Sequence, residues 1–204
     1  MICLTLRENG KGSPMSGEEK IHVRYSREED AEAVFQAMCY VKERLANPSV
    51  YVADDLPYVK RHIEKDGFTL IAERSGVLAG FLIVHLPGLG EENLGREIGM
   101  EEEDLMRCAH IESEAVLPEY RGRGIQRLLL REAEKALLCR GYFFTMMTVS
   151  PENPYSLRNA LALGYQIMLT KEKYGGLMRH ILLKKLPAQG KPKMDEEIGD
   201  KESS

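Results

Sequence analysis

The stretch from Glu112 to Arg140, ESEAVLPEYRGRGIQRLLLREAEKALLCR, decides the fold. Ile111 to Leu117 is mostly apolar and predicts a buried strand, which ends at Pro118 because proline has no N–H for a sheet ladder. Tyr120 to Gly124 predicts a tight turn, since its two glycines can adopt positive φ angles. A helix follows and ends near Gly141, because glycine commonly closes a helix. The sequence therefore predicts a strand, a tight turn and a helix in one run.

The predicted helix is amphipathic, because apolar residues recur along one side of it at helical spacing. They are Ile125, Leu128, Leu129, Ala133, Ala136 and Leu137. The first turn of a helix leaves backbone N–H groups unpaired, and together with the helix dipole they form a site for phosphate. Arg121, Arg123 and Arg127 add positive charge there. The alternative is a purely structural turn with solvated arginines.

The segment VLPEYRGRGIQRLL, residues 116–129, resembles the acetyl-CoA motif of the GNAT superfamily of N-acetyltransferases. That motif is usually written Arg/Gln-x-x-Gly-x-Gly/Ala. Read from Arg121, the motif fits except that Gln126 fills the last small-residue position. Read from Glu119, both glycines fit and the glutamate replaces Arg or Gln. The two registers differ in which backbone amides meet the pyrophosphate of CoA, and both stay open.

The resemblance covers about residues 21–186 and implies the GNAT fold, an α/β fold with a central mixed sheet flanked by helices. It also implies acetyl-CoA as cosubstrate and no metal. In that fold the strand before the motif and the strand after its helix are parallel and splay apart, and pantetheine bonds the strand backbone in the gap. The residues implied to contact acetyl-CoA here are Ala115, Val116, Leu117, Arg121, Gly122, Arg123, Gly124, Ile125 and Gln126.

A second segment resembles the part of the family that completes the CoA site. Asn153 opens a predicted helix, and the resemblance makes Asn153, Ser156 and Asn159 candidate contacts to pantetheine or pyrophosphate. The alternative is helix capping by the first of these, with the other two solvated. Many family members place a tyrosine seven positions after that Asn as the general acid, but here the position is Ala160. Nearby tyrosines are Tyr155, Tyr165 and Tyr174, of which Tyr165 is expected in the core.

Three polar residues on the motif strand are the catalytic candidates. His110, Glu112 and Glu114 are predicted to share one face, because strand side chains alternate. Carboxylates among apolar neighbours cost free energy unless they are hydrogen-bonded or functional. The resemblance points to Glu112 first and His110 second as general base, and it puts Glu114 beside the acetyl group, where the backbone is used. Partial burial is expected to raise the pKa of Glu112 toward the working pH. A water-bonded strand edge is the alternative.

The remaining pattern predicts the other elements of a mixed α/β domain. Ser26 is a candidate N-cap, with Glu29 completing a capping box, for a helix from Arg27 to about Leu45. A second helix is predicted at residues 56–65 and a third at 152–163. Strands are predicted at residues 21–25, 68–73, 77–86, 107–117, 142–149, 165–170 and 178–185. Ser75-Gly76 and Tyr174-Gly175-Gly176 are the predicted hairpin turns.

The segment between the predicted strands at 77–86 and 107–117 is acidic. Seven carboxylates lie within residues 91–104, against a single Arg96. Because the segment directly precedes the motif strand, we expect it to border the entrance of the acceptor. Carboxylates there would attract a cationic amine, an effect that salt screens. A solvated, partly helical connection is the alternative.

Composition sets the remaining expectations. The 204 residues are 43% hydrophobic, which suits one domain: a flexible lead at 1–20, the acetyltransferase-like domain at 21–186 and a disordered tail at 187–204. A net charge of -4 argues against nucleic acid as a partner. The four cysteines form no C-x-x-C pair, which favours a reducing cytoplasm over disulfides or zinc. No apolar run approaches the length of a membrane span. A homodimer is compatible with the resemblance.

Two functions from different classes fit these observations. The first is an acetyl-CoA-dependent N-acetyltransferase that acts on a small amine acceptor by direct attack with a general base. The second is a CoA-binding sensor or partner module with weak or no turnover, which Ala160 and Gln126 favour. Release of CoA in the presence of amines discriminates between them.

Overall fold

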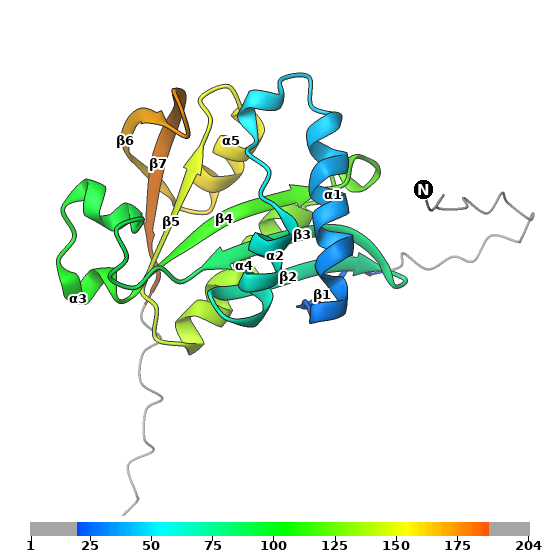
Figure 1. Cartoon of the computed structure of the whole chain (residues 1–204), viewed down its shortest axis with the longest axis horizontal. Helices are drawn as coiled ribbons and strands as arrows, with labels where there is room; N and C mark the ends of the chain where they lie inside the picture. Colours follow the sequence, from blue (N-terminus) through cyan, green and yellow to red (C-terminus); the bar gives the residue numbers. More distant parts are fainter. Residues whose placement is uncertain (1–19, 188–204) are drawn as a thin grey trace, which may run out of the picture.

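The computed structural model describes residues 20–187, so the predicted lead and tail fall almost entirely outside the described residues. The described chain forms one seven-stranded sheet with helices on both faces (Figure 1). The strands are β1 (His22–Tyr25), β2 (Gly67–Arg74), β3 (Val77–His85), β4 (Cys108–Val116), β5 (Phe144–Val149), β6 (Gln166–Lys173) and β7 (Leu177–Lys185). The α-helices are α1 (Ala31–Glu43), α2 (Leu56–Glu64), α3 (Glu102–Leu105), α4 (Ile125–Cys139) and α5 (Pro154–Ala162). Short 3-10 turns are η1 (Glu28–Asp30), η2 (Pro48–Val50), η3 (Leu94–Ile98) and η4 (Pro118–Tyr120).

The strand order is β1-β2-β3-β4-β5-β7-β6, which puts the motif strand β4 in the centre. Only β4 and β5 pair in parallel, and their register runs from Cys108 opposite Phe144 to Ile111 opposite Met147. Beyond Ile111 no described residue of β5 pairs with β4, so the two strands separate. The resulting gap opens on the carboxyl side of both strands, where ligands of parallel α/β sheets commonly bind.

Two layers of apolar side chains hold the helices to the sheet. On one face α1 and α2 cover Ile71, Phe81 and Ile83, and this is the face nearest the viewer in Figure 1. On the other face α4 packs Leu129 and Leu137 against β2, β3 and the first half of β4. The sheet is therefore buried on both sides, and the loops at the open end of β4 and β5 are left to form a site.

The start of α1 differs from the prediction. Asp30, and not Glu29, closes the capping interaction: its Oδ2 accepts from the Arg27 backbone N–H at 2.7 Å. Arg24 also donates to both oxygens of Asp30, at 2.7 and 2.9 Å, and its hydrogen bond holds the pKa of that carboxyl below the ordinary value. Ser26 instead donates its backbone N–H to Thr69, so the α-helix begins at Ala31, four residues later than predicted.

The acidic segment folds into η3 and α3 around one buried amide. The Asn93 side chain is 1% exposed and donates to the carbonyls of Gly88 at 2.7 Å and Leu105 at 3.1 Å. Its oxygen accepts from the Gly95 N–H at 2.9 Å. These three bonds tie the two ends of the segment together, and the segment is partly helical, as one alternative expected. That it borders the entrance of the acceptor stays a prediction.

A β-bulge interrupts β4 at its midpoint. Ser113 pairs with Ile83, while Ile111 pairs with the next residue, Val84, so Glu112 is the extra residue. One extra residue reverses which side chains face which side of a sheet. Ile111 accordingly packs on the α4 face, whereas Ala115 packs on the face of α1 and α2. The prediction that the three catalytic candidates share one face is therefore wrong.

Candidate functional site

A cavity of about 680 Å³ extends between the start of α4, the second half of β4 and the start of α5. Ten residues predicted to contact acetyl-CoA line it: Ala115, Val116, Arg121, Gly122, Gly124, Ile125, Gln126, Asn153, Ser156 and Asn159. Two do not, since Leu117 packs against the cluster of α1 and α2 and Arg123 lies near the Tyr120 ring, 5.9 Å from its centroid. The structure thus brings together two segments about thirty residues apart in sequence.

The start of α4 presents open backbone to this cavity. Gly122 and Gly124 have φ angles of 76° and 74°, in the left-handed region that favours glycine. A Cβ at Gly122 would meet no atom within 4 Å, and one at Gly124 would only reach the Arg127 side chain at 4.0 Å. The N-cap residue Gly124 has no side chain with which to cap the helix, so the N–H groups of the first turn can bind an anion. Arg121 and Arg127 also line the cavity.

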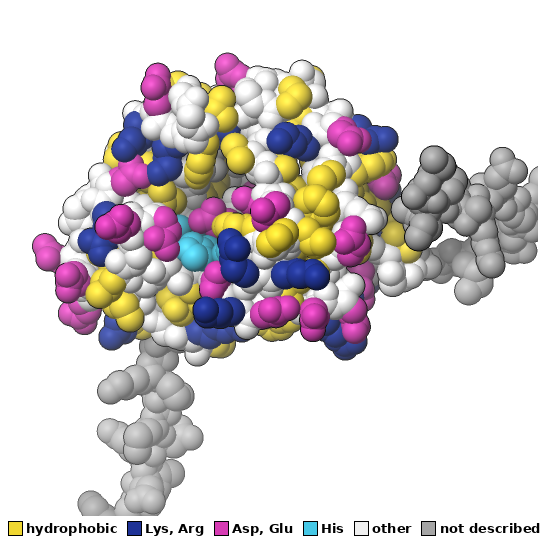
Figure 2. Space-filling view, in the orientation of Figure 1, with side chains coloured by type: hydrophobic (Ala, Val, Ile, Leu, Met, Phe, Trp, Pro, Cys, Tyr) yellow, Lys and Arg dark blue, Asp and Glu magenta, His cyan; other side chains and the backbone are white. Residues whose placement is uncertain are grey.

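A smaller cavity of about 80 Å³ occupies the gap between β4 and β5. Ile111 and Glu112 of β4 face Met147, Thr148 and Val149 of β5 across it. Four residues line both cavities and so mark where the two meet: Tyr51, Glu114, Asn153 and Ser156. On the face shown in Figure 2, a histidine and several acidic side chains border a hollow in the surface.

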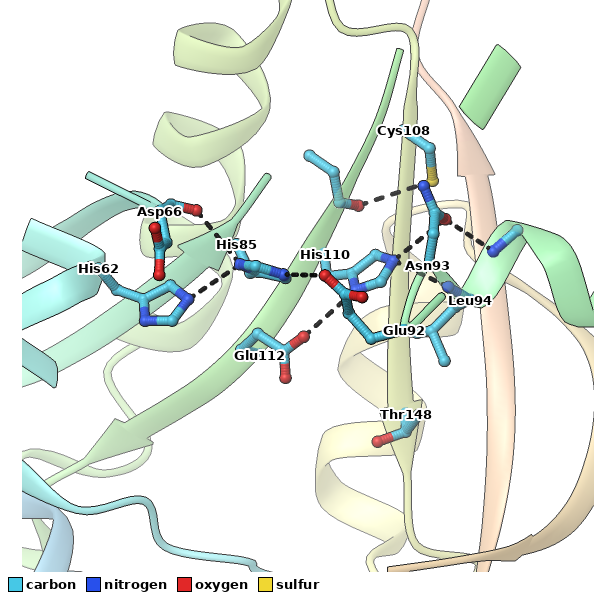
Figure 3. Close-up of polar contacts among 12 residues, drawn as sticks. His62, Asp66, His85, Glu92, Asn93, Leu94, Cys108, His110, Glu112 and Thr148 are labelled. Carbon is cyan, nitrogen blue, oxygen red and sulfur yellow. Dashed lines mark hydrogen bonds and ion pairs between the residues drawn. The ribbon is translucent and has the colours of Figure 1, made fainter. Parts of the chain in front are cut away.

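Glu112 points into the small cavity and is held by His110. The Leu94 N–H donates to His110 Nε2 at 3.1 Å, and this shorter contact favours an unprotonated Nε2 over the 3.4 Å alternative of donation to Asn93 Oδ1. Nδ1 must then carry the hydrogen of the neutral ring, and it donates to Glu112 Oε1 at 3.2 Å (Figure 3). His110 is 1% exposed, whereas the Glu112 side chain keeps 27% of its surface exposed. The acidic segment thus fixes the tautomer of His110, and His110 orients Glu112.

The pKa of Glu112 is lowered, contrary to the expected rise. Burial alone would raise this pKa. The hydrogen bond from His110, together with the positive charge that three nearby histidines carry when protonated, outweighs burial. His62 and His85 are the other two, and their nitrogens approach to 2.9 Å in a row from α2 through β3 toward β4 (Figure 3). The prediction failed because burial was considered without the donor that accompanies it. Glu112 is therefore an ionised carboxylate at neutral pH.

Glu114 lies in the opposite environment, on the α4 side of the sheet. Its Oε1 accepts a hydrogen bond from Gln126 Nε2, and the same amide nitrogen reaches Ser156 Oγ at 3.3 Å. The Gln126 oxygen in turn accepts from Asn159 Nδ2, which fixes the orientation of the amide. Burial raises the pKa of Glu114 to about 7, against the hydrogen bond from Gln126. Its Oε2 is shielded from solvent and has no hydrogen-bond partner among the described residues.

A second carboxylate stands near Glu112. Asp54, in the segment between η2 and α2, makes no ion pair through its carboxylate with any residue in the described range. Burial first, and then the charge of Glu112, raises the pKa of Asp54 to about 6. Burial and the charges of Glu112 and Asp54 also raise the pKa of Tyr58. The charge of Glu112 thus acts on both Asp54 and Tyr58, and two neighbouring carboxylates beside an aromatic ring favour a cation.

Ala160 stands at the position of the missing tyrosine and is 1% exposed. Tyr165 is buried, as predicted, and accepts from Thr145 at 3.0 Å. Tyr155 is 77% exposed and lines the large cavity, whereas Tyr174 pairs with Thr148 at 3.2 Å and lines neither cavity. Tyr51, which sequence reasoning missed, sits at the junction with its hydroxyl 2.6 Å from Ser113 Oγ. Its segment carries no periodic pattern, so only the tertiary structure reveals it.

The described residues contain neither a candidate metal centre nor a helix that could span a membrane. No group of three or more His, Cys, Asp or Glu side chains there is arranged to hold a metal ion. No helix in residues 20–187 is long and apolar enough to cross a membrane.

Comparison with known proteins connects this site to a family. The model of the acetyltransferase (GNAT) family matches residues 37–165, more than half of the chain. A comparison with curated proteins gives no match. A structure from Salmonella typhimurium with its cofactor acetyl-CoA shares 17% identity over 86% of this chain and 99% of its own, with a TM-score of 0.61.

Two further solved structures are similar to this chain to the same degree. An acetyltransferase of the GNAT family from Streptococcus pneumoniae shares 15% identity over 82% of this chain and 100% of its own, with a TM-score of 0.62. An N-acetyltransferase from Staphylococcus aureus shares 15% identity over 82% and 99%, with a TM-score of 0.61. At these identities the likeness concerns the fold.

Proposed function

Because the chain belongs to the GNAT family of acetyltransferases, we propose that it transfers an acetyl group from acetyl-CoA to the primary amine of a small cationic acceptor. The observation that carries the proposal is the meeting of two cavities in the gap between β4 and β5. The large one has a helix start suited to phosphate, and the small one holds an ionised carboxylate. Donor and acceptor would meet at the junction.

The large cavity fits acetyl-CoA. The pyrophosphate would be held by the N–H groups at the start of α4, with Gly122 and Gly124 leaving room and Arg121 and Arg127 adding charge. The pantetheine would follow the unpaired edge of β4 past Ala115 toward the junction. When bound, acetyl-CoA supplies an activated acetyl group on a thiol leaving group.

Glu112 is the proposed general base. A base must be ionised and within reach of the amine proton, and Glu112 is ionised and partly exposed in the small cavity. His110 cannot serve as the base in this arrangement, because its one unprotonated nitrogen accepts from the Leu94 N–H. It is a positioning residue: it holds Glu112 and keeps it charged.

A cationic acceptor is supported by the charges around Glu112. Asp54 and Glu112 repel each other, and an ammonium group bound beside them would relieve that repulsion. Of the acidic segment, Glu92 approaches this region, with its Oε1 3.5 Å from His85 Nε2. Glu97 is instead neutralised by Lys171 and Lys173. The support for a cation thus comes mainly from Asp54, with the acidic segment contributing less than expected from the sequence.

The competing function is a CoA-binding module without turnover, which the buried Ala160 favours. CoA release should be measured with acetyl-CoA and a panel of amines that includes 1,4-diaminobutane and a lysine peptide. Wild type is expected to turn over a cationic amine, and Glu112→Gln to keep acetyl-CoA affinity while kcat falls by about 10²-fold or more. Glu64→Gln, an exposed change on α2, is the control. Tight acetyl-CoA binding without turnover of any amine would favour the module. The cytoplasmic location and a homodimer remain predictions.

A further inference from the structure

The bulge at Glu112 gives the two carboxylates of β4 different surroundings. Glu112 lines only the small cavity, beside His110 and its neighbouring histidines. Glu114, two residues later, lies at the junction of both cavities and faces α4. Two carboxylates whose environments separate their protonation states are the usual arrangement of a base and an acid in one active site.

The hydrogen bonds around Glu114 locate its proton. Gln126 is oriented by Asn159 and donates through Nε2 to Glu114 Oε1, so Oε1 acts as an acceptor. When the carboxyl is protonated, the hydrogen therefore sits on Oε2. That oxygen is shielded from solvent and has no partner among residues 20–187. Glu114 lines both cavities, so a rotation of its carboxyl group would bring this proton to a ligand atom at their junction.

We propose that Glu114 is the general acid of the reaction and protonates the sulfur of CoA as it leaves, in place of the tyrosine absent at Ala160. This inference rests on the proposed acetyl transfer and assigns a role that the family resemblance had given to the backbone alone. Glu112 takes one proton from the ammonium, and the nitrogen forms its bond to the acetyl carbon. As the C–S bond breaks, its electron pair goes to sulfur and the Oε2 proton of Glu114 follows.

The protons then balance over one turnover. The nitrogen releases its second proton to solvent, and Glu112 later does the same with the proton that it received. Glu114 regains one proton from solvent once the thiol product has left. The sum is one amide, one thiol and one proton released per turnover, with no other reactant needed. While it is ionised, the Glu114 carboxylate keeps the hydrogen bond from Gln126.

The nearest competitor for this role is Tyr51, which is weaker on physical grounds. Its hydroxyl is already paired with Ser113 Oγ, and burial raises its pKa far above the ordinary value. A carboxyl that titrates near 7 lies below the ordinary value of a thiol, so donation from Glu114 to sulfur is downhill, whereas donation from Tyr51 is uphill.

Burial is the main cause of the raised pKa of Glu114, because the groups that face its carboxyl are neutral. Gln126 of α4 and Ser156 of α5 are neutral. Tyr51, which precedes α2, and Tyr165, which follows α5, both have raised pKa values and stay neutral at pH 7. Glu112 is the charged group nearest along its own strand, and Arg121 and Arg127 line the large cavity, with Arg121 Nε donating to the Val116 carbonyl at 3.3 Å. Bound acetyl-CoA would exclude solvent further and favour the protonated form.

The test compares Glu114→Gln with wild type, Glu112→Gln and the control Glu64→Gln, using acetyl-CoA and 1,4-diaminobutane. We expect kcat of Glu114→Gln to fall by about 10²-fold. Wild type should lose activity as the pH rises through the pKa of Glu114, at or above about 7, because the acid must be protonated. Glu114→Gln should lack this basic limb, and Glu112→Gln should keep it. A pH profile of Glu114→Gln parallel to that of wild type, with only the affinity for acetyl-CoA reduced, would show a structural role and overturn the proposal.

A second measurement does not depend on turnover. In infrared difference spectra, wild type should show a protonated-carboxyl band at pH 6 that disappears by pH 8, and Glu114→Gln should lack part of it. Asp54 titrates nearby, but it contributes equally to both proteins. If this difference is absent, Glu114 holds no proton to give and the proposal fails. If the difference is present but no amine on the panel is acetylated, it is the proposed function that fails.

Discussion

His110 makes two hydrogen bonds with opposite roles, and two substitutions can separate them. Its Nδ1 donates to Glu112, and its Nε2 accepts from the Leu94 N–H. The amide of His110→Asn lies where Nδ1 was, so it can still donate to Glu112 but leaves the Leu94 N–H without a partner. The longer side chain of His110→Gln puts its amide where Nε2 was, so it keeps the hydrogen bond to Leu94 and loses the hydrogen bond to Glu112.

The magnitudes follow from what each bond holds. Leu94 is buried, at 6% exposed, and a buried N–H without a partner costs about 1–3 kcal/mol, so His110→Asn should lose that much unfolding free energy. The bond to Glu112 involves a charged acceptor and is worth about 1.5–3 kcal/mol. Its loss in His110→Gln removes the donor that lowers the pKa of Glu112, while the burial that raises this pKa remains.

The sign of the pH effect is fixed by the direction of that shift. A base with a lowered pKa is active above that pKa and loses activity as the pH falls through it. The stability that the lowered carboxyl contributes is likewise present above its unfolded pKa and lost on the acid side. In His110→Gln the acidic limb of kcat should therefore move to higher pH, with little change near pH 7. In His110→Asn the limb should stay in place.

The assay is kcat against pH with acetyl-CoA and 1,4-diaminobutane, together with urea unfolding of both variants. An acidic limb unmoved in His110→Gln would refute the claim that His110 holds the pKa of Glu112 down. Complete loss of activity in both variants at every pH, with folding intact, would make His110 itself the base and reverse the assignment. The two variants control each other, because each keeps the bond that the other removes.

Two further predictions concern the ligand sites. Gly124→Glu should abolish acetyl-CoA binding in calorimetry, because it adds bulk and negative charge at the start of α4. The control Gly76→Glu, at the equally left-handed and open hairpin turn, should bind acetyl-CoA normally. Wild-type affinity of Gly124→Glu would refute the pyrophosphate placement. Asp54→Asn should reduce kcat/KM for 1,4-diaminobutane by about tenfold and weaken its dependence on ionic strength, since one of two attracting charges is gone. An unchanged salt dependence in Asp54→Asn would exclude Asp54 from the acceptor site.

The order of elements was predictable from the sequence because glycine and proline mark its turns. Gly141 closes α4 with a φ of 81°, and Ser75-Gly76 makes the β2–β3 turn with φ angles of 51° and 75°. The same local chemistry located the large cavity, since the glycine turn and the start of α4 are adjacent in sequence. At the start of α1 local pattern failed, because Arg24 on β1 recruits Asp30 and moves the helix start.

Contacts between distant segments could not be predicted from the sequence. Tyr51 and Asp54 reach the site from an irregular segment, and His62 and His85 come from elements with no motif of their own. Their positions depend on how α2 packs against the sheet and on how η3 closes over β4. Sequence spacing carries no information about such convergence, so the charge state of Glu112 could not be predicted correctly.

The bulge in β4 is the feature with the largest chemical consequence. Regular alternation would put Glu112 and Glu114 on one face with His110, where two neighbouring carboxylates would repel and one of them would take up a proton. The extra residue instead leaves Glu112 beside histidines, which favour its ionised form, and turns Glu114 toward α4, where burial favours its protonated form. Each carboxylate thereby has the protonation state that its proposed role requires at neutral pH. Removal of the bulge by deleting one residue of β4 would therefore be expected to cost both roles at once, even with every polar side chain of the strand retained.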